Sequence, residues 1–280
     1  PTRISPDAAR LFKSRVALYE GSWLTYFAGT AFVPNGEGWP GKAKEYNANY
    51  QYPTGSVDAE AKYFLQESAK AAEMVADKYK DQLMVNTGTI PQKEGDPQNP
   101  YFNIWGTTDM SGTPEVILWR QYSKELGVVN NVEVGVQHGD FGVGLTRSMV
   151  EGYVMKDGKP IYNSAYTYSD QTIADVATNR DPRLTIFLKV PGQKNVFKNM
   201  SAPEDHYVID EPYPTITTRN AENDYSTGYA IRKGGTFDKA NTGNGNCYNA
   251  AEIFRATEAL LNYMEAEYML TNSLSGKVLE

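Results

Sequence analysis

The sequence predicts a mainly α-helical protein, built from tetratricopeptide-like helix pairs that carry long irregular loops and short β-hairpins. Three long stretches, 5–30, 56–82 and 250–272, repeat apolar side chains at the three- and four-residue spacing of a helix. The segment between the second and third stretches is mostly irregular and rich in Gly, Pro and Asn, which favour turns. No internal boundary is evident, so 1–280 is expected to form a single domain.

The first helix is expected to start at Ser5, a suitable N-cap, with Pro6 at the first helical position. Its predicted apolar stripe consists of Phe12, Val16, Tyr19, Trp23 and Phe27. Gly, Pro and Asn dominate the following segment, 31–55, which is too long for a simple connection and is expected to be functional or disordered.

The second helix, 56–82, is expected to be capped by Ser56 or Asp58, and its alanines permit close approach to a neighbour. Its helical spacing is set by Phe64, Ser68, Ala72, Val75 and Tyr79. The loop before it is far longer than a regular tetratricopeptide repeat contains.

The third helix, 250–272, is predicted to present an apolar side of Ile253, Leu260, Leu261, Met264 and Tyr268. Arg255 and Glu258 are three residues apart, so we expect an ion pair on one face. Glu258 and Glu265 share a face two turns apart. Paired carboxylates can indicate glycoside hydrolysis, but nothing else in the sequence supports that chemistry, and the helix is interpreted as a packing element.

The middle of the chain contains short elements. Strands are predicted at 115–123, 183–190 and 228–233, and a short helix at 144–155. The sequence DGKPI at 157–161 places Asp-Gly between strand-like pieces, which predicts a hairpin.

The motif RDPRL at 180–184 predicts a fixed corner, because Pro182 disfavours helical geometry at Asp181. Asp181 is expected to accept backbone N–H groups and to pair with Arg180 or Arg183, and the alternative is that one arginine binds ligand. In TGYAIRK at 227–233, Arg232 and Lys233 suit a solvated strand edge, or a site for an acidic sugar.

The charge and composition exclude several classes. The net charge of −7 and the lack of a basic run argue against nucleic acid as a partner, and no apolar stretch is long enough for a membrane helix. The lone cysteine, Cys247, suits a small, partly buried residue better than a nucleophile. We expect the chain to be incomplete at both ends, because no signal peptide precedes PTRISPDAA and SLSGKVLE lacks a helix terminator.

No metal or nucleotide motif is present, so no cofactor is expected. The oxygen-rich turn DKANTGNGN at 238–246 leaves room for a structural calcium ion, but it lacks the ligand spacing of an EF-hand.

Aromatic residues are the strongest functional signal, with 20 Tyr, 10 Phe and 4 Trp. Such rings stack on the C–H faces of sugars, and they also simply cover loop-rich surfaces. The loop aromatics and their neighbours give six candidate ligand-binding residues: Trp39, Tyr101, Trp105, Tyr122, His138 and Phe141.

The order of these segments resembles the SusD/RagB family over about 3–270. RDPRL and TGYAIRK are the most specific local matches. LYEGSW, PEVILWRQY (114–122), GLTRSMVEGYVMKDGKPI and the final helix, which is similar to the pattern RxxExLLNYxEA, support them. The resemblance implies a SusD-like α/α superhelix and a surface-exposed, lipid-anchored lipoprotein of the outer membrane. Such proteins bind nutrients, usually glycans, and act with a SusC-like TonB-dependent transporter in polysaccharide utilisation.

In the starch-binding member of the family an aromatic arc holds the sugar. Part of that arc comes from the segments that resemble 115–123 and 137–147, which matches Tyr122, His138 and Phe141 in position only. No tryptophan occupies 137–147, so the glycan itself does not carry over. The first hypothesis is a non-catalytic glycan-binding subunit. The second is a helical scaffold or lid that binds the transporter together with a peptide or other non-glycan ligand. The third is a glycoside hydrolase.

Overall fold

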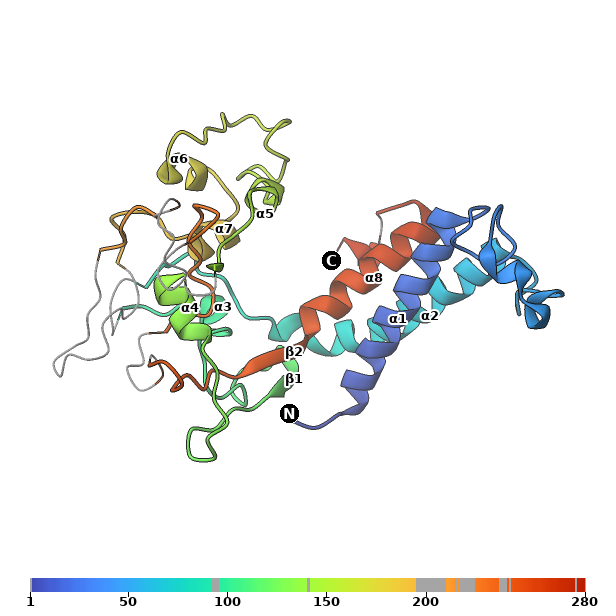
Figure 1. Cartoon of the computed structure of the whole chain (residues 1–280), viewed down its shortest axis with the longest axis horizontal. Coiled ribbons are helices and arrows are strands. Elements are labelled where there is room, and N and C mark those ends of the chain that lie inside the picture. Colours follow the sequence, from blue (N-terminus) through green and yellow to red (C-terminus); the bar gives the residue numbers. More distant parts are fainter. Residues whose placement is uncertain are drawn as a thin grey trace. The chain divides into compact units, whose positions relative to one another are not determined.

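A computed structural model describes residues 2–91, 96–139, 142–194, 210–214, 216, 225–236, 241, 243–274 and 276–279. The chain forms two compact units (Figure 1). Unit 1 comprises Pro1–Leu83, Pro114–Trp119 and Ile253–Glu280, and unit 2 comprises Met84–Thr113 and Arg120–Glu252. The single domain expected from the sequence stays a prediction.

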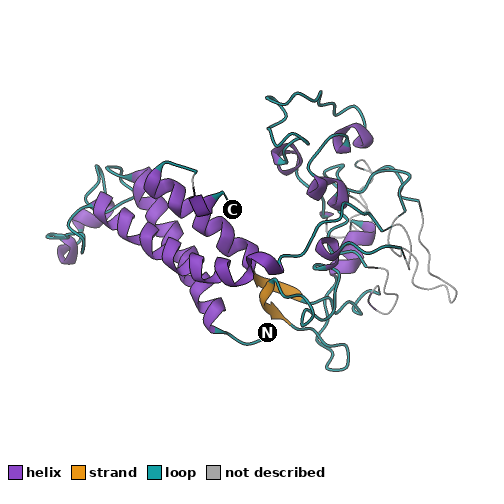
Figure 2. Cartoon of the chain, turned by 180° about the vertical axis from the view of Figure 1, so that it is seen from behind, coloured by secondary structure: helices purple, strands orange, loops and turns teal. Residues whose placement is uncertain are grey.

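Unit 1 contains three long helices that lie side by side, α1 (Pro6–Phe27), α2 (Val57–Tyr79) and α8 (Ala256–Thr271) (Figures 1 and 2). They confirm the mainly α-helical fold and the three helices predicted from the sequence. Short 3₁₀ turns accompany them at η1 (Pro40–Ala43), η2 (Glu45–Asn47), η3 (Lys80–Gln82) and η6 (Gly276–Val278). None of the helices in the described residues is long and apolar enough to cross a membrane.

The caps of α1 and α2 are those predicted. The Ser5 hydroxyl accepts a hydrogen bond from the N–H of Ala8 at 3.2 Å, and Ser56 accepts one from Ala59 at 3.1 Å. Pro6 occupies the first helical position, where its missing N–H leaves no helical bond unmade. Both helix starts therefore follow from local sequence alone.

The face that α1 buries is not the one predicted from its aromatic spacing. Phe12, Val16 and Tyr19 are more than half exposed. The buried face of α1 instead consists mainly of small residues and leucines: Ala8, Leu11, Ser14, Ala17, Leu18, Gly21 and Leu24. The same correction applies to α8, whose predicted apolar side is exposed at Leu261, Met264 and Tyr268, whereas Ala256, Ala259, Asn262 and Ala266 are buried.

Close approach of the helices explains this choice of face. A Cβ atom on Gly21 of α1 would lie only 2.8 Å from Cγ of Leu65 on α2, so the two helices meet where a side chain is absent. Large aromatic residues would hold the axes apart, whereas Gly, Ala and Ser let them pack. A buried polar contact crosses all three helices, because Ser14 accepts from Asn262 through Oγ and from Ser68 through its carbonyl.

A two-stranded sheet joins β1 (Val116–Arg120) to β2 (Ala251–Arg255), so the strand predicted at 115–123 is shorter and α8 begins after a strand. The expected pairing of Arg255 with Glu258 is wrong. Arg255 pairs instead with the buried carboxylate of Glu115 at 3.2 Å. Glu258 accepts two hydrogen bonds from Arg15 at 2.5 and 2.6 Å.

The described residues of unit 2 form little regular structure. The helices among them are α3 (Pro100–Asn103), α4 (Val132–His138), α5 (Arg147–Gly152), α6 (Ile173–Ala177) and α7 (Pro182–Phe187). The helix predicted at 144–155 is confirmed as α5, but the strand predicted at 183–190 is wrong. Asp181 accepts the N–H of Arg183 and caps a helix that begins at Pro182, so local capping overrides the β-branched residues that follow.

The salt-bridged corner at RDPRL is confirmed, because Arg183 binds the carboxylate of Asp181. Arg180 has a different role from the pairing expected for it. Its guanidinium is buried and donates to the carbonyls of Val150 at 2.5 Å, Tyr153 at 2.8 Å and Val176 at 3.3 Å. It therefore binds the C-terminal ends of α5 and α6, where a cation also suits the helix dipole.

A second buried cation lies at the end of α4. Lys189 is 1% exposed and donates to the carbonyl of Val136 at 2.5 Å and to the hydroxyl of Tyr225 at 2.7 Å, with Glu211 3.6 Å away. Arg232 is also buried and donates to Gln193 at 2.5 Å. The solvated strand edge predicted for Arg232 is therefore wrong, and its brief strand is reduced to one bridge between Leu188 and Ile231.

The DGKPI segment forms the expected tight turn, but without paired strands. Met155 donates to the carbonyl of Lys159 at 2.8 Å, and Gly158 takes the positive φ of 76° that this turn requires. Met155 forms its isolated bridge with Arg180, so no paired strands extend from this turn.

Candidate functional site

Three of the predicted ligand-binding residues, Tyr101, Trp105 and Tyr122, belong to unit 2. The side chain of His138 and the whole of Phe141 lie outside the described residues, so their assignments stay predictions. Tyr101 and Trp105 are in direct contact, with ring centroids 4.9 Å apart in an edge-to-face arrangement. Trp105 and Tyr122 line the same pocket.

Trp39 lies in unit 1, in the segment between α1 and α2. Its half-buried ring packs on Tyr50, with centroids 5.7 Å apart. The ring also lies against Gly41, where a Cβ atom would approach it to 2.3 Å. One side of this indole is therefore occupied by its own loop, and a ligand role for Trp39 stays a prediction.

Trp105 is held firmly in unit 2. Its ring is 8% exposed and packs edge-to-face on Phe187 at 4.9 Å, while its indole N–H donates to Glu252 at 2.5 Å. The Lys233 ammonium lies over the ring, 4.3 Å from its centroid, which is a cation–π contact. Trp105 thus forms a rigid wall, and its contacts leave little ring surface for stacking on a sugar.

The first of two neighbouring hollows is here called the Trp105 pocket and has a volume of about 240 Å³. Trp105, Tyr122 and Lys233 line it together with Asn130, Val132, Gly234, Asn249, Ala250, Ala251 and Glu252. Asn130 donates to the carbonyl of Asn249 at 3.1 Å, and Asn249 donates to Gly234 at 3.0 Å. These bonds fix the amide groups of the pocket wall.

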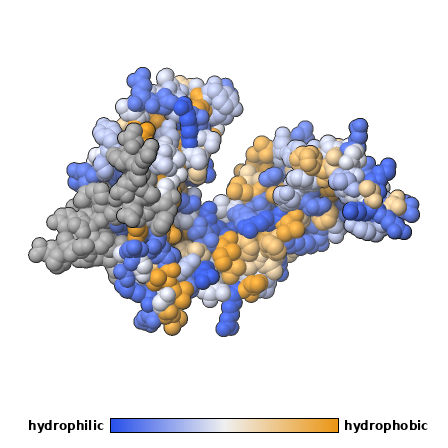
Figure 3. All heavy atoms as spheres, in the orientation of Figure 1, coloured by the Kyte–Doolittle hydropathy of each residue, from blue (hydrophilic) through white to orange (hydrophobic). Residues whose placement is uncertain are grey.

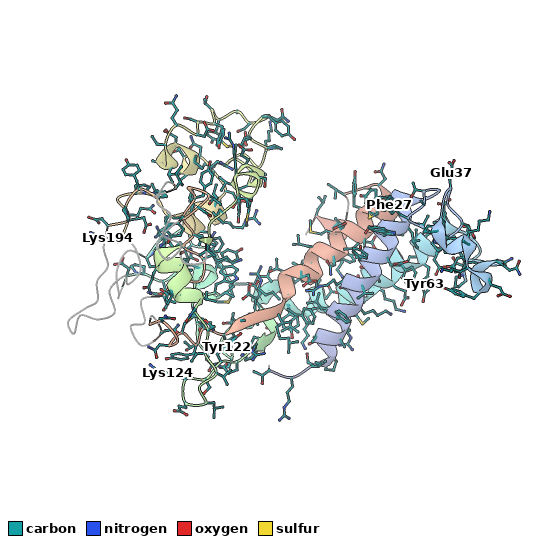
Figure 4. The ribbon with its side chains drawn as sticks, viewed as in Figure 1. Phe27, Glu37, Tyr63, Tyr122, Lys124 and Lys194 are labelled. Atoms are coloured by element: carbon teal, nitrogen blue, oxygen red, sulfur yellow. The ribbon has the colours of Figure 1, made fainter. Side chains whose placement is uncertain are left out.

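The second hollow is here called the Tyr122 groove and has a volume of about 560 Å³. It shares Tyr122 with the Trp105 pocket. Tyr122 and Lys124 are neighbours in this part of unit 2 (Figure 4). The lining combines two half-buried tyrosines with polar side chains: Thr108, Asp109, Gln121, Tyr122, Ser123, Lys124, Glu125 and Tyr248.

The groove offers both kinds of group that a sugar needs. Two tyrosine rings, Tyr122 and Tyr248, supply apolar faces with a polar hydroxyl at the edge. Asp109 accepts hydrogen bonds from the backbone N–H and the hydroxyl of Ser111, and these bonds hold the pKa of Asp109 below its usual value. Its carboxylate is therefore ionised at neutral pH and suited to accept ligand hydroxyls.

Local structure positions these residues. Tyr122 lies just beyond β1, which ends at Arg120, and the chain then turns so that Ser123 and Val128 pair across a tight loop with Gly127 at φ 65°. On the other side, Asn130 pairs with Cys247, directly before Tyr248. The strand end and this bridge thus bring 122 and 248 to one groove although they are far apart in sequence.

Cys247 is fully buried, and so more deeply packed than the partial burial expected from the sequence, and burial raises the pKa of its thiol. No cluster of His, Cys, Asp or Glu suited to a metal ion occurs among the described residues. The oxygen-rich turn at 238–246 is described only in part, and there Asn241 binds Asn249. A structural calcium ion stays a prediction.

The sequence missed several residues of the groove. Asp109, Lys124 and Tyr248 carry no motif, and Gln121 lies in the segment PEVILWRQY (114–122) without having been a candidate ligand-binding residue. Tyr248 stands beside Cys247 in a polar run, and a tyrosine that follows a buried cysteine in such a run is the one signal that could have identified it.

These features define a mainly helical protein whose loop-rich unit carries an open, tyrosine-lined polar groove. The SusD family matches residues 114–277, more than half of the chain, so the protein belongs to that family and the resemblance found in the sequence is confirmed. Neither the curated proteins nor the solved structures gave a match. Proteins of this family generally bind nutrients without catalysis and associate with SusC-like transporters.

Proposed function

We propose that this protein is a non-catalytic, cell-surface glycan-binding subunit that delivers oligosaccharide to a TonB-dependent transporter of the outer membrane. The observation that carries the proposal is the Tyr122 groove, in which Tyr122 and Tyr248 lie beside fixed polar groups. Apart from Thr108 and Asp109, the lining of the groove falls within the segment that the SusD family matches.

The proposed mechanism is stacking combined with hydrogen bonds. A tyrosine ring covers the C–H face of a pyranose, and the carboxylate of Asp109 accepts hydrogen bonds from hydroxyls at its edge. By analogy with base stacking, each stacked ring contributes about 1–3 kcal/mol. Loss of one ring should therefore weaken binding about tenfold or more.

Affinity electrophoresis tests this proposal. The wild-type chain is run through gels that contain amylopectin, galactomannan, dextran, polygalacturonate or chondroitin sulfate. We expect retardation by at least one glycan without release of reducing sugar, and a reduction of about tenfold or more for Tyr122→Ala and Tyr248→Ala. The matched control is Tyr162→Ala, because Tyr162 is 88% exposed in unit 2 and lines none of the pockets described.

Two results would contradict the proposal. Equal retardation of wild type, Tyr122→Ala and Tyr248→Ala would show that the groove is not the glycan site. Release of reducing sugar that tracks the purified protein would favour a glycoside hydrolase. The carboxylate of Glu258, considered for that chemistry in the sequence, is held by Arg15.

A second candidate function, a helical scaffold that binds another protein, is favoured by a separate observation. Apolar side chains of α1 and α8 remain exposed, and Figure 3 shows orange, apolar atoms at several places on the helical unit. The exposed residues are Phe12, Val16 and Tyr19 on α1 and Leu261, Met264 and Tyr268 on α8. Soluble surfaces rarely expose such rows without a partner. Capture of a transporter by the chain, with no glycan retardation, would favour this function.

A further inference from the structure

A third hollow lies in unit 2, away from the Tyr122 groove, and is here called the α6 pocket. It has a volume of about 400 Å³. Helices α5 and α6 occupy one end of unit 2, whereas Tyr122 and Lys124 lie toward the other end (Figures 1 and 4). The pocket shares no lining residue with the Tyr122 groove or the Trp105 pocket.

The floor of the α6 pocket is apolar and fixed. Ile173, Val176 and Tyr229 line it. All three belong to, or pack on, the buried cluster that includes Val150 and Leu184. The beginning of α6 is further held by Thr172 and Asp175, which accept each other's backbone N–H groups in a capping box. A ligand would therefore meet a preformed surface.

The rim of the α6 pocket is polar and charged. Arg147 donates through Nε to Glu151 at 2.6 Å and through Nη2 to Asp170 at 2.9 Å. A guanidinium has five N–H donors, so further donors remain after these two bonds. Tyr213 stands at the rim with 75% of its surface exposed, and Tyr229 lines the same pocket.

This combination suits one chemical class of ligand. Tyrosine rings provide apolar faces, while a fixed Arg–Asp pair presents donors and acceptors side by side to neighbouring hydroxyl groups. Among the residues that line the pocket, the positive charge of Arg147 is paired with the carboxylate of Asp170, and Glu151, which does not line the pocket, binds the same guanidinium. A carboxylated or sulfated sugar would place its charge beside the carboxylate of Asp170 and be repelled, whereas a neutral sugar would not.

We infer that the α6 pocket is a second saccharide site that binds neutral sugar units. Tyr213 stacks on the sugar ring, and Arg147 and Asp170 form hydrogen bonds with its hydroxyl groups. The inference rests on the proposed glycan-binding function and adds a site and a substrate class to it. Two sites on one chain bind a polymer more tightly than either binds a short oligosaccharide, because the second contact is intramolecular. The pocket would thereby hold long neutral glycans at the surface.

Affinity electrophoresis and calorimetry with paired variants test this inference. The variants are Tyr122→Ala, Tyr213→Ala, the double variant and Arg147→Met, with Tyr162→Ala as the matched control. The probes are amylopectin, galactomannan and dextran, the acidic polymers polygalacturonate and chondroitin sulfate, and maltoheptaose as a short neutral ligand. Amide hydrogen exchange of each variant checks that unit 2 keeps its fold.

We expect Tyr213→Ala and Arg147→Met each to weaken retardation by a neutral polymer about tenfold or more, and the double variant to lose it. A short neutral ligand that binds should show two sites per wild-type chain and one site in each tyrosine variant. Loss of retardation in Tyr213→Ala alone would support the α6 pocket and overturn the Tyr122 groove.

The outcomes separate the two claims. Loss in Tyr122→Ala with full binding in Tyr213→Ala and Arg147→Met would overturn the α6 pocket and leave the proposed function standing. Binding of only the acidic polymers would overturn the neutral ligand class. Failure of the wild-type chain to bind any of the polymers would overturn both the proposed function and this inference.

Discussion

The two units of this protein bury different kinds of side chain. Unit 1 fills the space between α1, α2 and α8 mostly with Ala and Leu. Unit 2 contains the buried cations of the described chain, Arg180, Lys189 and Arg232. The contrast follows the amount of regular structure in each unit.

A helix satisfies its own backbone, whereas loops do not. In unit 1 the helical bonds leave few buried carbonyls in need of a partner, so small apolar residues suffice. In unit 2 the short helices end quickly, and their last carbonyls need donors. Arg180 and Lys189 supply them from inside the unit. The loop-rich unit that carries the candidate site is therefore stabilised by a few buried charges.

The largest effect expected from this contrast is the loss of Arg180. Methionine has a similar length but no donor, so Arg180→Met leaves the carbonyls of Val150, Tyr153 and Val176 without their buried partner. We expect the free energy of unfolding to fall by about 3–5 kcal/mol. Denaturant titration measures the change, and amide hydrogen exchange assigns it to unit 2.

Arg147→Met is the matched control within the same unit. The side chain of Arg147 is 66% exposed and pairs with Glu151 and Asp170, which are 32% and 44% exposed, so its loss should cost less than about 1 kcal/mol. Equal destabilisation by the two variants would contradict the view that carbonyl capping by a buried cation stabilises this unit.

The next effect concerns pH and Lys189. Burial lowers the pKa of Lys189 to about 8, and Glu211 opposes that shift. Because the ordinary value is 10.5, the unfolded chain binds the proton more tightly than the folded one. Stability should therefore rise by about 3 kcal/mol as the pH increases from about 8 to 10.5. Below pH 8 the cost of burying the charge is present in full.

The charged and titratable groups around Lys189 set the control for that experiment. Glu211, Glu133, Arg232 and Tyr225 all interact with it, and each contributes its own pH dependence. The quantity to measure is thus the difference in unfolding free energy between wild type and Lys189→Met at each pH. A difference that stays constant from pH 7 to 10 would show that Lys189 does not titrate in this window.

The predictability of the fold differed between the units in the same way. Ser5, Pro6 and Ser56 were sufficient to place the starts of α1 and α2, because capping is local. The buried faces of α1 and α8 were predicted wrongly, because the large apolar residues that repeat along each helix lie mainly on its exposed side. Only the packing of the neighbouring helix decides that Gly21 must face inward.

In unit 2 the sequence indicated candidate residues, but it did not predict which neighbours would contact and bury them. Trp105 and Tyr122 do line one pocket, but the burial of Trp105 could not be predicted because Lys233 and Phe187 come from distant segments. RDPRL was correctly interpreted as a salt-bridged corner, yet Asp181 starts a helix where β-branched residues indicated a strand. Long-range partners decide both cases, and a motif does not contain them.

The smallest predicted effect comes from a comparison of two glycine-to-alanine substitutions. One is at a tightly packed glycine of unit 1, and the other is at an unpacked glycine of unit 2. In a helix, Gly→Ala normally stabilises by about 0.5–1 kcal/mol, because alanine has less freedom to lose. At Gly21 the new Cβ atom would lie 2.8 Å from Cγ and 3.0 Å from the backbone nitrogen of Leu65. Such overpacking costs about 1–3 kcal/mol, so Gly21→Ala should lower the stability of unit 1 by about 1 kcal/mol overall.

Gly152→Ala provides the comparison, because Gly152 ends α5 and nothing lies within 4 Å of the position that a new Cβ atom would occupy there. At this site the helix preference acts without a clash, and stability should rise by up to about 1 kcal/mol. Denaturant titration of both variants gives opposite signs if the contact of α1 with α2 requires a glycine. A gain in both would show that the helices can move apart at little cost, and that the small-residue face of α1 is not what sets their approach.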